Sequence, residues 1–189
     1  MDFLPYELQV KYLITLSCRE IGRYCLTSKT TTRILSDDWF WEEKTNRDFK
    51  LSLKTFPLDE THSLKKYLSI NRIWETYPVQ LIKMAIRKNN QPSLICLLNR
   101  LNVTLDMIDP ILEVMISSGV ERMASIIVPT IAMRYIVNTK SLADLNAFAG
   151  TFFKHGLRAL SKGKYVTTII MGIYWLVLTY IIQFLSRRR

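Results

Sequence analysis

The stretch PVQLIKMAIRKNNQPSLICLLNRLN, residues 78–102, decides the fold class that this sequence predicts. Its apolar side chains fall into two clusters with the spacing of amphipathic helices, and a polar break at Lys88–Gln91 separates them. The pattern returns in DPILEVMISSGVERMASIIVPTI, residues 109–131, with a break at Ser117–Gly119. The first helices of the two units align at an offset of 30 residues and the second helices at 29. Helix pairs with a period near thirty predict a short α-solenoid-like arrangement.

The paired helices resemble those of ankyrin repeats, as in LIKMAIRKNN followed by LICLL. The TPLHxA signature of that family is absent, and no glycine pair follows the second helix. The sequence therefore predicts helix pairs, not ankyrin repeats. Two units are fewer than such an array normally needs, so chance similarity between two amphipathic pairs is the alternative.

Helical spacing continues on both sides of these units. Residues 64–74 are compatible with one helix, and the preceding Lys50–His62, which contains Pro57, is expected to be a loop. Residues 141–161 predict a last amphipathic helix that closes a helical domain over residues 51–161. The alternative for this closing helix is a position on a membrane surface, with Lys154, Arg158 and Lys162 toward the lipid headgroups.

The C-terminal stretch Tyr165–Leu185 contains 21 residues without a charge. About 20 apolar residues suffice for a helix to cross a bilayer, and core helices of small domains are rarely apolar on all sides. The sequence therefore predicts a single transmembrane helix over residues 165–185. Its flanks are basic and are expected to contact lipid headgroups; they are Lys162, Lys164, Arg187, Arg188 and Arg189.

A single C-terminal span without an N-terminal signal is the layout of a tail anchor. The bulk of the chain is then expected in the cytosol. The endoplasmic reticulum, the mitochondrial outer membrane and a virion inner membrane are the candidate locations. Basic residues lie on both sides of the span, so their bias alone does not fix its orientation.

The charge distribution argues against a nucleic-acid partner. The formal charge is +10, but residues 1–161 hold 21 basic and 16 acidic side chains, without a clustered basic face. Three unevenly spaced cysteines suit reduced thiols in a cytosolic domain. The two histidines, His62 and His155, lack metal-ligand spacing and are expected at the surface or in loops.

The first fifty residues predict three or four short helices and no strand. Leu4, Leu8, Tyr12 and Leu16 recur every four residues, and Pro5 suits a first helical turn. Ser17 with Glu20 predicts a capping box for a second helix, and Asp37 or Asp38 is expected to begin a later one. This later helix carries the adjacent aromatics of DDWFW, residues 37–41.

Five pieces of this region, in order, resemble the F-box family: LPYEL at 4–8, Ile14 with Leu16, REIGRYCLTSK at 19–29, DDWFW at 37–41, and the trailing WEEKTNRDF. The last piece resembles forms of the motif found in large DNA viruses. Glu20-Ile21 stands where Asp-Leu is common in the family. The resemblance covers about a quarter of the chain, residues 2–49.

The resemblance implies a docking module, residues 1–50, that binds a Skp-type adaptor of a cullin-RING ubiquitin ligase. The adaptor contacts that it implies are Leu4, Pro5, Leu8, Ile14, Leu16, Ile21, Leu35 and Trp41. Leu16, like Leu13 and Tyr24, is expected rather to form the internal core. Trp41 is expected to be partly buried against a partner or the following helices, and Trp39 to pack less.

No motif predicts catalysis or a cofactor: GxxxxGK[ST], GxGxxG, GxSxG and HExxH are all absent. The acids of residues 37–43 crowd one segment, whereas paired catalytic acids normally flank a pocket from separate elements. We therefore expect no enzyme. We expect a membrane-anchored adaptor that presents an unidentified protein for ubiquitination. The alternatives are a structural membrane protein of a viral or organellar envelope, in which the F-box-like segment only packs, and a tail-anchored bundle of Bcl-like layout.

Overall fold

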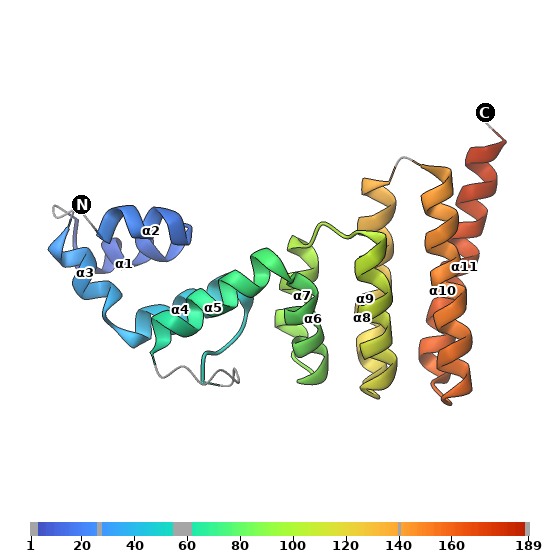
Figure 1. Cartoon of the computed structure of the whole chain (residues 1–189), viewed down its shortest axis with the longest axis horizontal. Helices are drawn as coiled ribbons and strands as arrows, with labels where there is room; N and C mark the ends of the chain where they lie inside the picture. The colour runs from blue at the N-terminus through green and yellow to red at the C-terminus, as the bar shows by residue number, and fades with distance from the viewer. Residues whose placement is uncertain (1–3, 26–27, 55–61, 140, 188–189) are drawn as a thin grey trace. The chain divides into compact units, whose positions relative to one another are not determined.

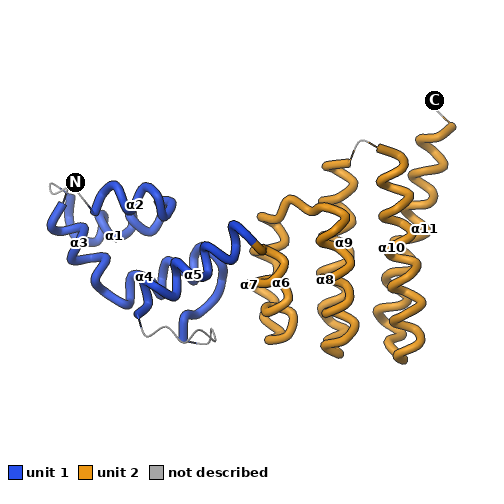
Figure 2. Tube along the Cα trace, in the orientation of Figure 1, with its two compact units in different colours: residues 1–76 blue, residues 77–189 orange. Residues whose placement is uncertain are grey.

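The computed structural model describes residues 4–25, 28–54, 62–139 and 141–187. Within these ranges the chain forms eleven α-helices and no strand (Figure 1). The chain divides into two compact units, residues 1–76 and 77–189 (Figure 2). The sequence predicts a boundary near residue 50; the structure instead groups residues 51–76 with the N-terminal helices.

Unit 1 contains five helices: α1 (Tyr6–Thr15), α2 (Cys18–Cys25), α3 (Lys29–Leu35), α4 (Asp38–Phe49) and α5 (Ser63–Thr76). Helix α4 is central, since α1, α3 and α5 all contact it, while α2 packs on α3. Its buried side chains include Trp41 and Phe49, which contact Tyr67 of α5, and Phe40, which packs on Trp41. Four large aromatic side chains, Phe40, Trp41, Phe49 and Tyr67, thus lie in this small core beside buried aliphatic side chains.

Unit 2 contains three helix pairs, visible as three layers in Figure 1. The pairs are α6 (Pro78–Arg87) with α7 (Gln91–Arg100), α8 (Leu105–Ser117) with α9 (Glu121–Asn138), and α10 (Leu142–Ser161) with α11 (Tyr165–Ser186). The first helices contact one another in the order α6, α8, α10, and the second helices in the order α7, α9, α11. Each layer therefore buries its apolar face against the next.

Each pair turns through a residue with positive φ directly after the C-cap of its first helix. These residues are Asn89, Gly119 and Gly163, with φ of 52°, 73° and 69°. At the last turn, the N–H of Gly163 donates to Leu160 O and that of Lys164 to Ala159 O, each at 2.9 Å. This is a Schellman motif, which requires a left-handed residue and so favours glycine or asparagine.

The helices differ from the sequence expectation at the second pair. Helix α8 begins at Leu105, before the predicted start at residue 109, and Pro110 lies within it. Helix α9 continues past Pro129 to Asn138. Pattern reading treats proline as a boundary, but burial of the flanking side chains, such as Ile127, Val128 and Ile131, maintains the helix across it. Helices α5, α10 and α11 agree with the predicted spans to within two residues.

Helix α11 is long and apolar enough to cross a membrane, by length and composition. In the structure it packs against α10 and α9. Only Thr167, Met171 and Leu178 are buried, whereas most of its other apolar side chains remain exposed. Helix α11 is therefore both the predicted membrane segment and one half of the third helix pair.

The expectation that both histidines lie at the surface or in loops is wrong for His155. Its side chain is buried in α10, and Nε2 lies 2.7 Å from Oδ1 of Asp109 on α8. Lys154 and Arg158 also pair with α8, at 3.8 Å from Asp109 and 2.9 Å from Glu113. The cationic side of α10 thus faces an acidic side of α8, and α10 packs within the stack, in which α11 is the last helix.

Candidate docking surface of the N-terminal unit

The start of α1 presents the exposed apolar side chains of the predicted docking surface. Leu4 and Leu8 are 43 % and 48 % exposed, and Pro5 between them is the exposed N-cap of α1. The side-chain amide of buried Gln9 donates to Leu4 O at 2.7 Å, which fixes the chain entering the helix. Tyr12, one turn after Leu8, is also exposed, so Leu8 and Tyr12 form one row along α1, and exposed Leu4 lies just before the helix.

The predicted capping box orders the turn between α1 and α2. Glu20 Oε2 accepts from the backbone N–H and the hydroxyl of Ser17, both at 2.7 Å, and Ser17 Oγ accepts from Glu20 N at 3.3 Å. These bonds favour the ionised carboxylate, and they hold the pKa of Glu20 below its ordinary value. The box sets the angle at which α2 leaves α1.

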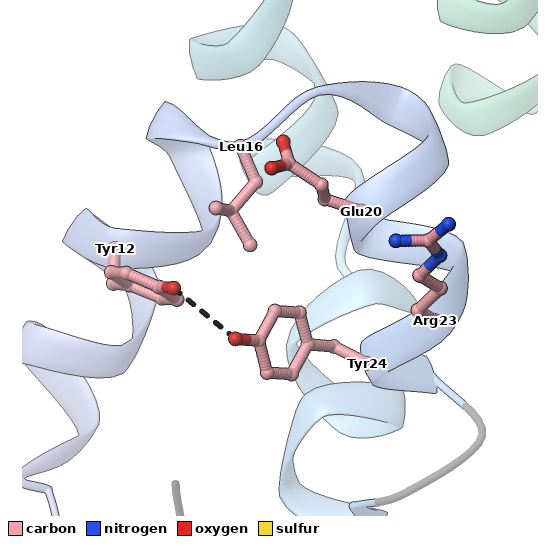
Figure 3. Close-up of a pocket in the computed structure, with 5 residues that line it drawn as sticks. All are labelled: Tyr12, Leu16, Glu20, Arg23 and Tyr24. Atoms are coloured by element: carbon pink, nitrogen blue, oxygen red, sulfur yellow. Dashed lines mark hydrogen bonds between the residues drawn. The ribbon is translucent and has the colours of Figure 1, made fainter.

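An open cleft of about 330 Å³ lies between α1 and α2. Tyr12, Leu16, Glu20, Arg23 and Tyr24 line it (Figure 3). The two tyrosine hydroxyls meet at 3.2 Å, with the rings edge to face. The hydrogen bond with Tyr24 raises the pKa of Tyr12, so the phenol of Tyr12 stays neutral at physiological pH. The cleft is therefore lined by apolar side-chain carbons, two hydroxyl groups, and one charged side chain of each sign, Glu20 and Arg23.

The remaining predicted contacts lie deeper. Ile14 and Leu16 are half-buried, and Ile21, Leu35 and Trp41 are buried in the core of unit 1. The indole of Trp41 donates to Leu35 O at 2.7 Å. Trp39, its near neighbour, is 53 % exposed, as the sequence predicts for the less packed aromatic. The exposed members of the predicted set are therefore Leu4, Pro5 and Leu8.

The acids around DDWFW organise the backbone. Asp37 is the N-cap of α4, where its Oδ1 accepts from Trp39 N at 2.9 Å. Glu42 accepts from Leu53 N at 3.0 Å and from the Ser52 hydroxyl, so it anchors residues 52–53 to α4. The described part of the predicted loop at 50–62 is held in this way; residues 55–61 lie outside the described ranges.

Sequence reasoning missed a buried lysine at the centre of unit 1. Lys44 is 1 % exposed, and its ammonium group donates to Asp48 at 2.7 Å and to Ile14 O at 3.1 Å. The Tyr67 hydroxyl donates to the same Asp48 oxygen at 2.9 Å. Lys44 thereby links α1, α4 and α5. A local signal could have identified this lysine. Lys44 lies on the same helix as the buried residues Trp41 and Thr45, and Asp48 follows it by one turn.

The predicted membrane flanks lie at the two ends of α11. Lys162 and Lys164 lie in the turn before it, and Arg187 is its C-cap; Arg188 and Arg189 lie outside the described residues. Cys18, Cys25 and Cys96 are present as thiols, and burial raises the pKa of Cys18 and of Cys25.

The chain was compared with models of known protein families, with curated proteins and with solved structures, and none of them matches it.

Proposed function

We propose that unit 1 is an F-box-like docking module that binds a Skp-type adaptor of a cullin-RING ubiquitin ligase. The observation that carries this proposal is the set of exposed apolar side chains at the start of the unit, namely Leu4 before α1 and the α1 row of Leu8 and Tyr12. In a unit of 76 residues these side chains are a large apolar area to leave in water, and such area is typical of protein interfaces.

The structure of unit 1 adds a second argument for docking. Gln9, the capping box and Lys44 all hold α1 in a defined position, since each bonds to the backbone at one of its ends. A surface that is ordered before binding loses less conformational entropy when a partner binds. An exposed apolar row on a helix held in this way thus favours a docking function over the alternative in which this segment only packs within the unit.

Unit 2 is proposed to hold the substrate protein and to attach the chain to a membrane. Stacked helix pairs present extended surfaces suited to protein partners. Helix α11, with Lys162 and Lys164 before it and Arg187 after it, suits a cytosol-facing membrane of the endoplasmic reticulum, the mitochondrial outer membrane or a virion inner membrane. The adaptor would thus recruit a ligase to proteins near that membrane, without chemistry of its own.

The test is co-purification of a Skp-type adaptor with the full-length chain and with two matched variants. Leu8→Glu places a charge in the exposed row on α1. Leu68→Glu does the same at an exposed leucine of α5, 42 % exposed. We expect Leu8→Glu to abolish recovery of the adaptor and Leu68→Glu to retain it, with equal helical circular dichroism for both.

Two outcomes would reject this proposal. If Leu8→Glu recovers as much adaptor as the unmodified chain does, the α1 row is not part of the interface. Absence of any ligase component, with stoichiometric recovery of the chain in a membrane particle, would favour the structural envelope role instead.

A further inference from the structure

The outer face of the third helix pair is apolar, although it is the end of the stack. Terminal units of stacked helical arrays normally carry a polar outer face, because no further unit covers them. Here α10 exposes Phe153, Leu157 and Leu160, and α11 exposes a longer row that includes Ile169 and Leu176. The end of the stack thus resembles an interior layer that lacks its neighbour.

The exposed row of α10 points away from the second pair. His155 faces α8, where it meets Asp109. At 100° per residue, Phe153 and Leu157 each lie roughly 160° from His155 around the helix. They therefore lie on the side of α10 opposite α8. On α11, Leu176 lies roughly 180° from buried Thr167 by the same count, so both helices present their apolar rows outward.

The two rows form one continuous surface. The rings of Phe153 and Trp175 are 5.1 Å apart, and Phe153, Leu157, Trp175 and Leu176 line a shared hollow of about 250 Å³. The polar side of α10 faces α8 and not this surface, since Lys154 and Arg158 form ion pairs with Asp109 and Glu113 of α8. The apolar surface at the end of the stack is thus formed by two helices, α10 and α11. It is wider than α11 alone, which is the segment that composition identifies.

This packing conflicts with a bilayer-spanning α11 in the folded stack. Phe153 of α10 lies beside Trp175, near the middle of α11. Lys154 and His155, with their partner Asp109, would follow α11 to the same depth. Charged side chains within the hydrocarbon region are costly. The folded stack can instead place both helices parallel to the bilayer, with their apolar rows immersed about 5–10 Å.

We propose that the α10–α11 pair, with its hairpin lying in the plane of the membrane, is the lipid-binding surface of this protein. The proposal rests on the membrane attachment proposed above and replaces a spanning helix by an in-plane helical hairpin. The occupant is a bilayer containing anionic lipid, because Lys162 and Lys164 in the hairpin turn and Arg187 at the other end place positive charge at both ends of the apolar face.

The test uses the full-length chain in vesicles of phosphatidylcholine and phosphatidylserine. Single cysteines replace Leu157, Ile169, Leu176 or Asn99 in a background with Cys18, Cys25 and Cys96 changed to alanine. Each carries an environment-sensitive fluorophore, and lipids with nitroxides at shallow or deep positions quench it. Asn99, exposed on α7 of the first layer, is the matched control outside the proposed surface.

We expect Leu157, Ile169 and Leu176 probes to be quenched mainly by shallow nitroxides, and to similar extents, while the Asn99 probe is not quenched. A spanning α11 that separates from α10 would instead separate Ile169 from Leu176 in depth by about 10 Å and leave the Leu157 probe like the Asn99 probe. That result would overturn the in-plane proposal but keep membrane attachment. Quenching of none of the four probes would reject membrane attachment itself, and a dimer formed without lipid would indicate that a second copy covers the face.

A matched pair of variants tests the contribution of α10 directly. Phe153→Ser with Leu157→Ser alters the proposed surface, and Met133→Ser with Val137→Ser alters an exposed apolar pair of the same spacing on α9. We expect the first variant to transfer between vesicles about tenfold faster, because it buries less apolar area in lipid and therefore dissociates more readily. Equal transfer rates for the two variants would overturn the proposal; equal helical circular dichroism confirms that both fold.

Discussion

The Nε1 atom of Trp41 donates a 2.7 Å hydrogen bond to the carbonyl oxygen of Leu35. This bond joins α4 to the last residue of α3, and the indole packs on Phe40 and Tyr67 at ring distances of 5.0 and 5.1 Å. Trp41 thus belongs to the core of unit 1, and a substitution there is expected to change the stability of the unit, whatever its effect on docking.

Trp41→Ala is expected to lower the free energy of unfolding by about 3–5 kcal/mol, since it leaves a large cavity in the core. Trp41→Phe keeps most of the ring but leaves the buried Leu35 carbonyl without its donor, and is expected to cost about 1–3 kcal/mol. Denaturant unfolding of the detergent-solubilised chain, followed by circular dichroism, measures both. Trp39→Ala is the control and should stay within about 0.5 kcal/mol; equal losses for the two tryptophans would contradict this assignment.

Glu20 makes the stability of unit 1 depend on pH. The capping-box bonds lower its pKa below the ordinary value of about 4.3. Its carboxylate therefore stabilises the folded chain fully above that value, and the contribution is lost as pH falls through the lower pKa of the folded state. The difference in denaturation midpoint between the unmodified chain and Glu20→Ala should be present at pH 7 and shrink toward pH 3. A difference independent of pH would show that the bonds do not require the charge.

Lys44→Met keeps the buried stem but removes the ammonium group from Asp48 and Ile14 O. We expect a loss of about 3 kcal/mol in unfolding free energy, because breaking a buried pair leaves the remaining charge poorly compensated. Lys44→Met combined with Asp48→Asn should recover part of this loss. Additive effects of the two changes, measured by a double-mutant cycle, would show that they do not interact.

His155 and Asp109 are expected to couple α10 to α8. A double-mutant cycle with His155→Ala and Asp109→Ala should give a coupling free energy of about 1.5–3 kcal/mol, the range for hydrogen bonds to charged groups. The measurement is the midpoint of denaturant unfolding. Arg158→Ala, which breaks a more exposed ion pair with Glu113, should cost less than about 1 kcal/mol. A larger loss for Arg158→Ala than for His155→Ala would reverse this ranking.

Gly156 lies at the contact between α10 and α11. A Cβ atom at Gly156 would lie 3.5 Å from Met171 Cβ, an ordinary contact, so Gly156→Ala should stabilise α10 by up to about 1 kcal/mol. Gly156→Leu would overpack the contact and cost about 1–3 kcal/mol. Gly150→Leu is the matched control, because its Cβ meets no atom within 4 Å. The fluorescence of Trp175 reports whether α11 stays in place, and a tolerated Gly156→Leu would show a looser contact than the structure has.

The helical class and most helix bounds were predictable because strong apolar periodicity and local caps determine them. Ser17 with Glu20, and Asp37 before α4, act within a few residues and are visible in sequence. The second pair was predicted too short: α8 begins four residues before the predicted start at residue 109, and α9 ends seven residues after the predicted end at residue 131, because tertiary burial extends both helices. The burial of His155 depends on Asp109, which lies 46 residues away, and no local pattern records that pairing. The pair of Lys44 with Asp48 is local, but the contacts of Lys44 with Ile14 O and of Asp48 with Tyr67 are not.

Among the predicted docking residues, the sequence indicated exposure correctly only for those at the start of the chain. Leu4, Pro5 and Leu8 precede or begin a helix and stay exposed, whereas Ile21, Leu35 and Trp41 carry the same apolar signal but face inward. Apolar character alone does not distinguish an interface from a core; the direction of each side chain in the folded unit does. That direction depends on how α1, α3 and α4 pack on one another.

The packing of α11 on α9 and α10 has a practical consequence for producing this protein. Removing a C-terminal hydrophobic segment is the usual way to obtain a soluble fragment of an anchored protein. A chain ended before Tyr165 would uncover the side of α10 that carries Gly156 and the α9 face that α11 covers. Such a fragment should aggregate, whereas solubilisation of the whole chain in a mild detergent should preserve its native packing.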